Sequence, residues 1–359
     1  MKKQLIITLC ALMTSGLLYA QNSENVIQKF KRAFQSEAFQ LAGYGQLQYN
    51  FSEYPERALV PMKTNNSFDI TRIFIFASGK LGDRNQFGYM VIYDFGPNSK
   101  MYEVYGEWFS SKKFNVRFGQ FKIPFTIENP MSMSRMETIN PSRSASALVG
   151  GAGDFNQWEP DGRIVNKTGR DAGLQVYGSL LPAADFYHLD YYAGFFNGTG
   201  LNTKDNNNFK DFLGTAYFYP VKELKFGGSV YLGKYPDYMK YYLLGNNQNT
   251  RRWTVGAEYK GTHFNSRIEY IQSTDGELRR NGYYGLFMYK PVPDKWEVLG
   301  KYDYYNDDVL FNKNPIHDVT IGINYYFAYL SRIQLNYIYT DNYSLGKNHA
   351  LAAQLQVYF

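Results

Sequence analysis

The chain has 359 residues, of which 18% are aromatic, yet its mean hydropathy of -0.44 resembles that of a water-soluble protein. The formal charge of +6 includes Lys2 and Lys3, and the remaining excess is too small to indicate a nucleic-acid partner. The only cysteine, Cys10, lies in the apolar N-terminal run, so the exported chain would have no disulfide, thiolate metal site or cysteine nucleophile.

Residues 1–20 have the pattern of a signal peptide. Two lysines precede an apolar run from Leu5 to Ala20, and the small Ala20 stands before Gln21. A membrane anchor needs roughly 20 apolar residues, and this run is shorter. We therefore predict export, with the mature chain starting near Gln21.

Residues 21–40 differ from everything that follows them. Ile27, Phe30, Phe34 and Ala38 recur at helical spacing with charged residues between them, which predicts a short periplasmic amphipathic leader. Two interpretations remain open: a segment packed at the mouth of a barrel, and an element that binds a partner or plugs a pore.

From residue 41 to 359 the pattern has period two, broken at turns. Long connections alternate with short ones, as an up-and-down barrel inserted from the periplasm requires, with short periplasmic turns and long outer loops. We predict an all-β, transmembrane, antiparallel barrel of about 16 strands, which is wide enough to enclose an aqueous lumen. The predicted strands cover residues 41–51, 68–80, 86–95, 101–110, 114–121, 169–180, 185–196, 211–219, 224–233, 251–260, 263–273, 281–290, 296–305, 316–327, 330–340 and 349–359.

The last predicted strand has an apolar face and a polar face. Leu351, Leu355 and Val357 alternate with Gln354 and Gln356, and the chain ends on the aromatic Phe359. An ending of this kind is typical of barrels in the outer membrane of Gram-negative bacteria. We expect Phe359 to serve as a barrel-assembly signal for the barrel-assembly machinery, and outer-membrane lipid to surround the barrel.

The connection at residues 122–168 is much longer than the others, at about 47 residues. Loops above about 15 residues are uncommon unless they are functional. The connection contains a possible helical piece at 131–138, a break at Asn140-Pro141 and a glycine-rich turn at 150–153. We expect it to fold inward as a constriction loop; a surface lid or a contact with a neighbouring subunit stays open as an alternative.

This region resembles a known family. The run RFGQFKIPFTIENP, from Arg117 to Pro130, and the Met- and Ser-rich stretch after it are similar to the phosphate-selective porin O and P family, specifically its Bacteroidetes members. The resemblance implies a trimeric outer-membrane porin in which lysines and arginines conduct small anions such as phosphate or polyphosphate. By position, it assigns Lys122 to the constriction, with Arg117 on the same strand.

The charges inside the predicted barrel are mixed. Ion selectivity depends on the charges at the narrowest ring of the pore rather than on the average charge of the lumen. The prediction of anion selectivity therefore rests on the basic residues of the long connection. The predicted pore-constriction residues are Lys122, Arg135, Arg143 and Arg117. The predicted lumen-lining residues are Arg72, Asp94, Glu103, Glu107, Arg267, Lys301 and Arg332.

Other functions receive less support from the sequence. The four histidines, His188, His263, His317 and His349, lie on separate predicted strands without a serine motif or metal-ligand spacing, so we expect no enzyme, no metal and no cofactor. Glutamines on inward positions disfavour a transporter for apolar molecules. A structural or adhesive barrel that binds a partner through its outer loops, at 197–210 and 234–250, remains the alternative to a porin.

Overall fold

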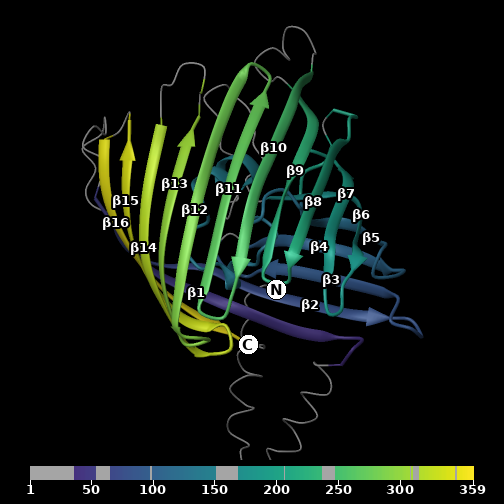
Figure 1. Cartoon of the computed structure of the whole chain (residues 1–359), viewed down its shortest axis with the longest axis horizontal. Helices are drawn as coiled ribbons and strands as arrows, with labels where there is room; N and C mark the ends of the chain where they lie inside the picture. The colour runs from purple at the N-terminus through teal and green to yellow at the C-terminus, as the bar shows by residue number, and fades with distance from the viewer. Residues whose placement is uncertain are drawn as a thin grey trace, which may run out of the picture.

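In the computed structural model, the described residues are 36–53, 65–97, 99–150, 169–205, 207–236, 247–307, 309, 315–343 and 346–359. Within them, sixteen antiparallel strands form one closed barrel, in which each strand pairs with its neighbours in sequence and β1 pairs with β16 (Figure 1). The predicted fold class is confirmed. The strands are β1 (Gln40–Ser52), β2 (Asn65–Leu81), β3 (Phe87–Asp94), β4 (Lys100–Phe109), β5 (Asn115–Lys122), β6 (Arg170–Pro182), β7 (Tyr187–Phe196), β8 (Asp211–Val221), β9 (Leu224–Pro236), β10 (Asn247–Lys260), β11 (Phe264–Asp275), β12 (Leu278–Val292), β13 (Trp296–Asn306), β14 (Pro315–Ala328), β15 (Ser331–Asn342) and β16 (Gly346–Tyr358).

Alternation along β16 shows why the sequence closes into a barrel. Leu355 and Val357 are exposed on the outer face, whereas Gln354 and Gln356 are buried on the inner face. Side-chain amides also join the first and last strands where the barrel closes, since Gln46 of β1 donates to Gln356 of β16 at 2.8 Å. Closure leaves no strand edge open to lipid, where unpaired backbone groups are costly. None of the described helices is long and apolar enough to span a membrane.

The two ends of the barrel differ in their connections. All connections at the end that holds the start of β1 and the end of β16 are short, and we call this end periplasmic; the opposite end carries the long connections and is called outer. Phe359 lies at the periplasmic end, where its N–H donates to Gly43 O at 2.9 Å and its carbonyl accepts from Gly43 N at 2.7 Å. Its ring covers Gly43, because a Cβ there would lie 2.7 Å from the ring atoms.

Only the last residues of the predicted leader fall within the described part of the chain. The Glu37 carbonyl accepts a hydrogen bond from Lys80 N–H, and the Ala38 carbonyl accepts one from the Tyr89 hydroxyl. Residues 36–39 therefore lie against the periplasmic ends of β2 and β3. The predicted signal peptide at 1–20 and the helical spacing before residue 36 lie outside the described residues.

The segment after β5, residues 123–150, lies inside the barrel, and we call it the inner segment. It contains the 3₁₀ turn η1 (Met133–Arg135), the short helix α3 (Arg143–Ala145) and the π turn η2 (Ser146–Gly150). The predicted helical piece at 131–138 is thus a single 3₁₀ turn. Most of the predicted turn at 150–153 and the rest of the connection lie outside the described residues.

The hydrophobic core of the molecule lies between the inner segment and the barrel wall. On one side, Phe125 and Leu148 pack with inward residues of β8, β9 and β11, among them Leu213 and Ile271. On the other side, η1 and the residue after it pack on an aromatic cluster of the β1, β2 and β4 walls, which consists of Tyr44, Phe74 and Tyr102. The inner segment therefore contacts opposite walls of the barrel.

Candidate pore constriction

The wall from β14 to β16 holds the inner segment by its backbone. Amide and guanidinium groups, all buried, donate to three carbonyls in and just after η1, and an inward asparagine accepts from an N–H of the segment. The bonds are Arg332 Nη2 to Met136 O (2.7 Å), Gln334 Nε2 to Glu137 O (3.1 Å), Gln356 Nε2 to Ser134 O (3.0 Å) and Ile139 N to Asn336 Oδ1 (2.9 Å). Inward polar side chains of this wall are thus used to fix the segment rather than to face solution.

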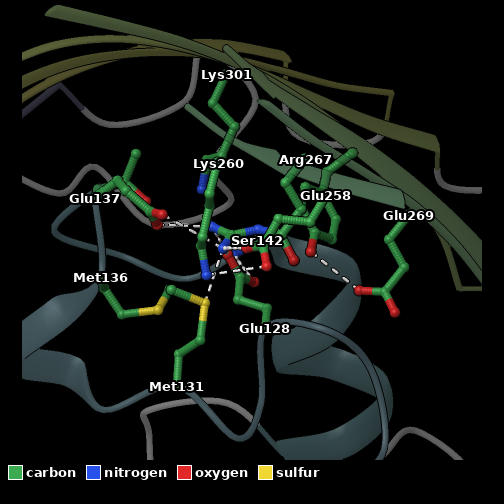
Figure 2. Close-up of polar contacts among 12 residues, drawn as sticks. Glu128, Met131, Met136, Glu137, Ser142, Glu258, Lys260, Arg267, Glu269 and Lys301 are labelled. Carbon is green, nitrogen blue, oxygen red and sulfur yellow. Dashed lines mark hydrogen bonds and ion pairs between the residues drawn. The ribbon is translucent and has the colours of Figure 1, made fainter. Parts of the chain in front are cut away.

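Arg267 of β11 ties the inner segment to the wall by charge. Its side chain is 2% exposed and lies 2.7 Å from Glu137, 3.2 Å from Glu258 and 3.7 Å from Glu128. Figure 2 shows Arg267 reaching from the strand toward the glutamates of the segment. A buried arginine needs such partners, because an unpaired charge in this position costs several kcal/mol.

The outer half of the inner segment makes a second ionic contact with the barrel, this time with β14. Arg143 of α3 binds Asp318 of β14 through two nitrogens, at 2.5 and 2.8 Å. Burial opposes the charge of Arg143, but the hydrogen bonds and charge of Asp318 outweigh it and raise the pKa of Arg143 above its ordinary value. Lys301 donates to Asn140 O at 3.1 Å and lies 3.3 Å from Asp303.

A polar cavity of about 470 Å³ borders this contact. Both charge signs are present in its wall, from Arg143, Lys301, Asp303 and Asp318, and the rest of the lining is mainly neutral and polar. Asn336 and Thr340 are among the neutral residues. The charged residues of this lining, two basic and two acidic, therefore give no excess of either sign.

Across the lumen, three bases line one small cavity of about 30 Å³, which has room for about two waters. They are Arg72 of β2, Lys122 of β5 and Arg170 of β6, and we call them the basic cluster. Arg170 lies 2.8 Å from Glu103, Arg72 donates to Gln46 at 2.8 Å, and Lys122 donates to the Met131 carbonyl of the inner segment.

Two further predicted constriction bases lie away from this cluster. Arg117 pairs with Glu107 at 2.7 Å and stacks on Tyr105, nearer the periplasmic end of β5. Arg135 is exposed and donates to the hydroxyl of Tyr329, in the periplasmic turn between β14 and β15. The four predicted bases therefore lie at different places in the lumen and do not form one ring.

The predicted lumen-lining residues divide between the two walls. Arg72 is a member of the basic cluster, Glu103 pairs with Arg170 of that cluster, and Glu107 pairs with Arg117. Arg267, Lys301 and Arg332 contact the inner segment. Asp94 is buried and accepts hydrogen bonds from the N–H groups of Ile73 and Gly96, so it shapes the outer end of β3.

Sequence reasoning did not single out Arg170. It stands opposite Lys122 in the β5–β6 register, a pairing that follows only if the exact ends of both strands are known. The anchoring role of Gln334 and Asn336 was also missed. The available signal was the set of apolar residues on inward positions, such as Leu213 and Ile271, which mark where an internal segment packs.

Comparison with known proteins places the chain among porins by sequence model and by fold. The model of a family described as phosphate-selective porin O and P matches residues 39–292. A search of curated proteins gives no match.

Solved structures are similar in fold. The anion-selective porin from Comamonas acidovorans has a TM-score of 0.63 and 13% identity, over 90% of this chain and 99% of that one. The outer membrane channel DcaP of Acinetobacter baumannii has a TM-score of 0.59 and 13% identity, over 89% and 97%. OmpT of Vibrio cholerae, solved in a trimer form, has a TM-score of 0.54 and 12% identity, over 90% and 100%.

Proposed function

The chain belongs to the phosphate-selective porin O and P family and is a porin of a Gram-negative outer membrane, and we propose that it gives passive diffusion to small hydrophilic solutes with a preference for anions such as phosphate or polyphosphate. Family and fold are those of channels rather than enzymes.

The basic cluster is the observation that carries the anion preference. Three bases line the narrow cavity beside the inner segment, and Glu128 is the one carboxylate among the described residues of the same lining, whereas Glu103 pairs with Arg170 from outside it. The excess of charge is therefore positive at a narrow place, where charge acts at short range. The anion-selective porin from Comamonas acidovorans has a similar fold, which agrees with the proposal.

The remaining assignments follow from this function. We assign residues 1–20 to a signal peptide, 21–40 to a periplasmic leader and 122–168 to a constriction loop, with Phe359 read by the barrel-assembly machinery. Lys122 is the central constriction residue, and Arg143, Arg135 and Arg117 act outside the basic cluster. We further propose a homotrimer, in line with the trimer form in which OmpT was solved.

Reversal potential in a salt gradient across a planar bilayer tests the proposal. The wild-type channel is expected to favour anions, and Lys122→Glu is expected to shift the reversal potential toward cations, because the substitution removes one positive charge and adds one negative charge at the narrow cavity. Lys204→Glu, on an exposed outer loop, is the matched control, since its charge is screened beyond a Debye length of about 8 Å at physiological salt.

Two results would contradict parts of this proposal. If Lys122→Glu behaves like Lys204→Glu, the constriction assignment is wrong. If bilayers stay silent although the folded barrel is inserted, the chain does not act as an open channel, and the structural or adhesive alternative takes its place.

A further inference from the structure

Two arginines at the outer end of the barrel face away from the lumen. Arg251 of β10 and Arg279 of β12 both flank Thr274 of β11 in the strand register. Each belongs to an arginine pair, and the strand alternation sends the other member inward, where Arg252 and Arg280 bind Asp275. Figure 1 shows β10, β11 and β12 side by side in the wall.

The outward face of these strands is the lipid face. Trp253 and Val255 follow Arg251 on the same face of β10 and are exposed, and so are Ile268 of β11 and Tyr283 of β12. Their apolar side chains form the band that meets the hydrocarbon of the bilayer. Arg251 and Arg279 are therefore placed directly above lipid-facing residues.

Their height corresponds to the outer membrane interface. At about 3.4 Å per residue and a strand tilt of about 40°, the stretch from Tyr259 to Arg251 rises roughly 20 Å, close to the height of the apolar band. Aromatic contacts mark the same level, since the rings of Trp253 and Tyr270 lie 5.2 Å apart next to the arginines. Aromatic girdle residues sit at the level of the lipid headgroups.

Neither guanidinium has a protein partner among the described residues. Both side chains are exposed, and the salt bridges of this region belong to Arg252 and Arg280 instead. An arginine at the edge of lipid is costly unless it reaches an anion or water. Its planar set of donors suits the oxygens of a phosphate group.

We propose that Arg251 and Arg279 form a binding site for the phosphorylated headgroup of a lipid in the outer leaflet. One phosphate lies over Thr274 between the two guanidinium groups, and the acyl chains run down the face of Trp253, Val255 and Ile268. The site is separate from the lumen, so it does not depend on which solute the channel carries.

Native mass spectrometry of the folded full-length protein with bisphosphorylated lipid A tests the site. The same lipid without phosphates is the reference ligand. We expect the wild-type protein to bind the phosphorylated lipid about tenfold more tightly, as two charge-assisted contacts allow. The double variant Arg251→Gln/Arg279→Gln is expected to bind both lipids equally.

The matched control is Arg84→Gln/Lys295→Gln, which removes two positive charges from periplasmic turns and is expected to keep wild-type binding. Heat modifiability on gels establishes that each variant is a folded barrel. Equal binding of both lipids by the wild-type protein would overturn the proposal. So would displacement of the lipid by equimolar inorganic phosphate, which indicates a free-anion site, or a change in oligomer mass without a change in bound lipid, which indicates a subunit contact.

Discussion

The two walls of the lumen contain the same kinds of side chain and use them differently. On the wall from β10 to β16, Arg267, Lys301 and Arg332 all contact the inner segment or its glutamates. On the wall from β2 to β6, the basic cluster lines a cavity together with the segment. The inner segment lies against both walls, since Lys122 donates to its Met131 carbonyl. An inward charge on a barrel strand is therefore not in itself a solute-binding charge: its role depends on which groups of the inner segment lie against it.

The largest effect on stability and conductance is expected from breaking the contacts between the inner segment and the wall from β10 to β16. Arg267→Met leaves Glu128, Glu137 and Glu258 buried without their common base, and loss of one partner of a buried ion pair costs roughly 3–5 kcal/mol. We expect the inner segment to loosen, the unfolding temperature to fall and the single-channel conductance to rise. Gel-based thermal unfolding and bilayer recordings measure the two effects.

Lys225→Met is the control for that substitution, because Lys225 pairs with Glu258 at 2.9 Å but leaves Arg267 in place. It should lower stability less and leave conductance near wild type. Wild-type conductance and unfolding temperature in Arg267→Met would show that the segment does not depend on this ion cluster.

A pair of neutralising substitutions sharpens the comparison between the walls. Lys122→Gln removes one charge from the basic cluster, whereas Lys301→Gln removes one whose Nζ is bound by Asn140 and Asp303. We expect a clear loss of anion preference in Lys122→Gln and a smaller change in Lys301→Gln, measured as reversal potentials. Equal shifts in the two variants would mean that both walls set selectivity.

The smallest change in ion selectivity is expected from a substitution at the periplasmic mouth of the barrel. Arg135 is exposed and contacts Tyr329, so Arg135→Glu changes a charge in contact with bulk solution. We expect a slight shift of the reversal potential toward cations that disappears at high salt, because mobile ions screen exposed charges. A shift as large as that of Lys122→Glu, persisting at high salt, would place Arg135 at the constriction instead.

The fold could be predicted from sequence because the alternation of apolar and polar residues within each strand shows which face meets lipid and which faces the lumen. Alternation places lipid-facing and lumen-facing residues without knowledge of any distant contact. Errors occur at strand ends, where this signal fades: β10 begins at Asn247 rather than at 251, since Asn247 to Thr250 are polar throughout and still pair with β9. Backbone pairing continues there although the pattern does not.

The site was less predictable because it depends on long-range packing. Lys122 was identified by resemblance, but its neighbour Arg170 becomes visible only in the strand register. Whether Lys301 or Arg332 faces solution depends on the path of the inner segment, which no local pattern determines. The sequence indicated that path only through apolar residues at inward positions, such as Leu213, against which the inner segment packs.

The seam between β1 and β16 has a consequence for the order of events during biogenesis. The hydrogen bond from Gln46 to Gln356 joins residues 310 positions apart, so β1 has no partner on this side until β16 has been synthesised and exported. An unpaired strand edge readily pairs with other chains, which makes the unfinished barrel a hazard in the periplasm. Phe359, bonded to Gly43, follows β16 directly, so a barrel that lacks this strand keeps an open edge at β1.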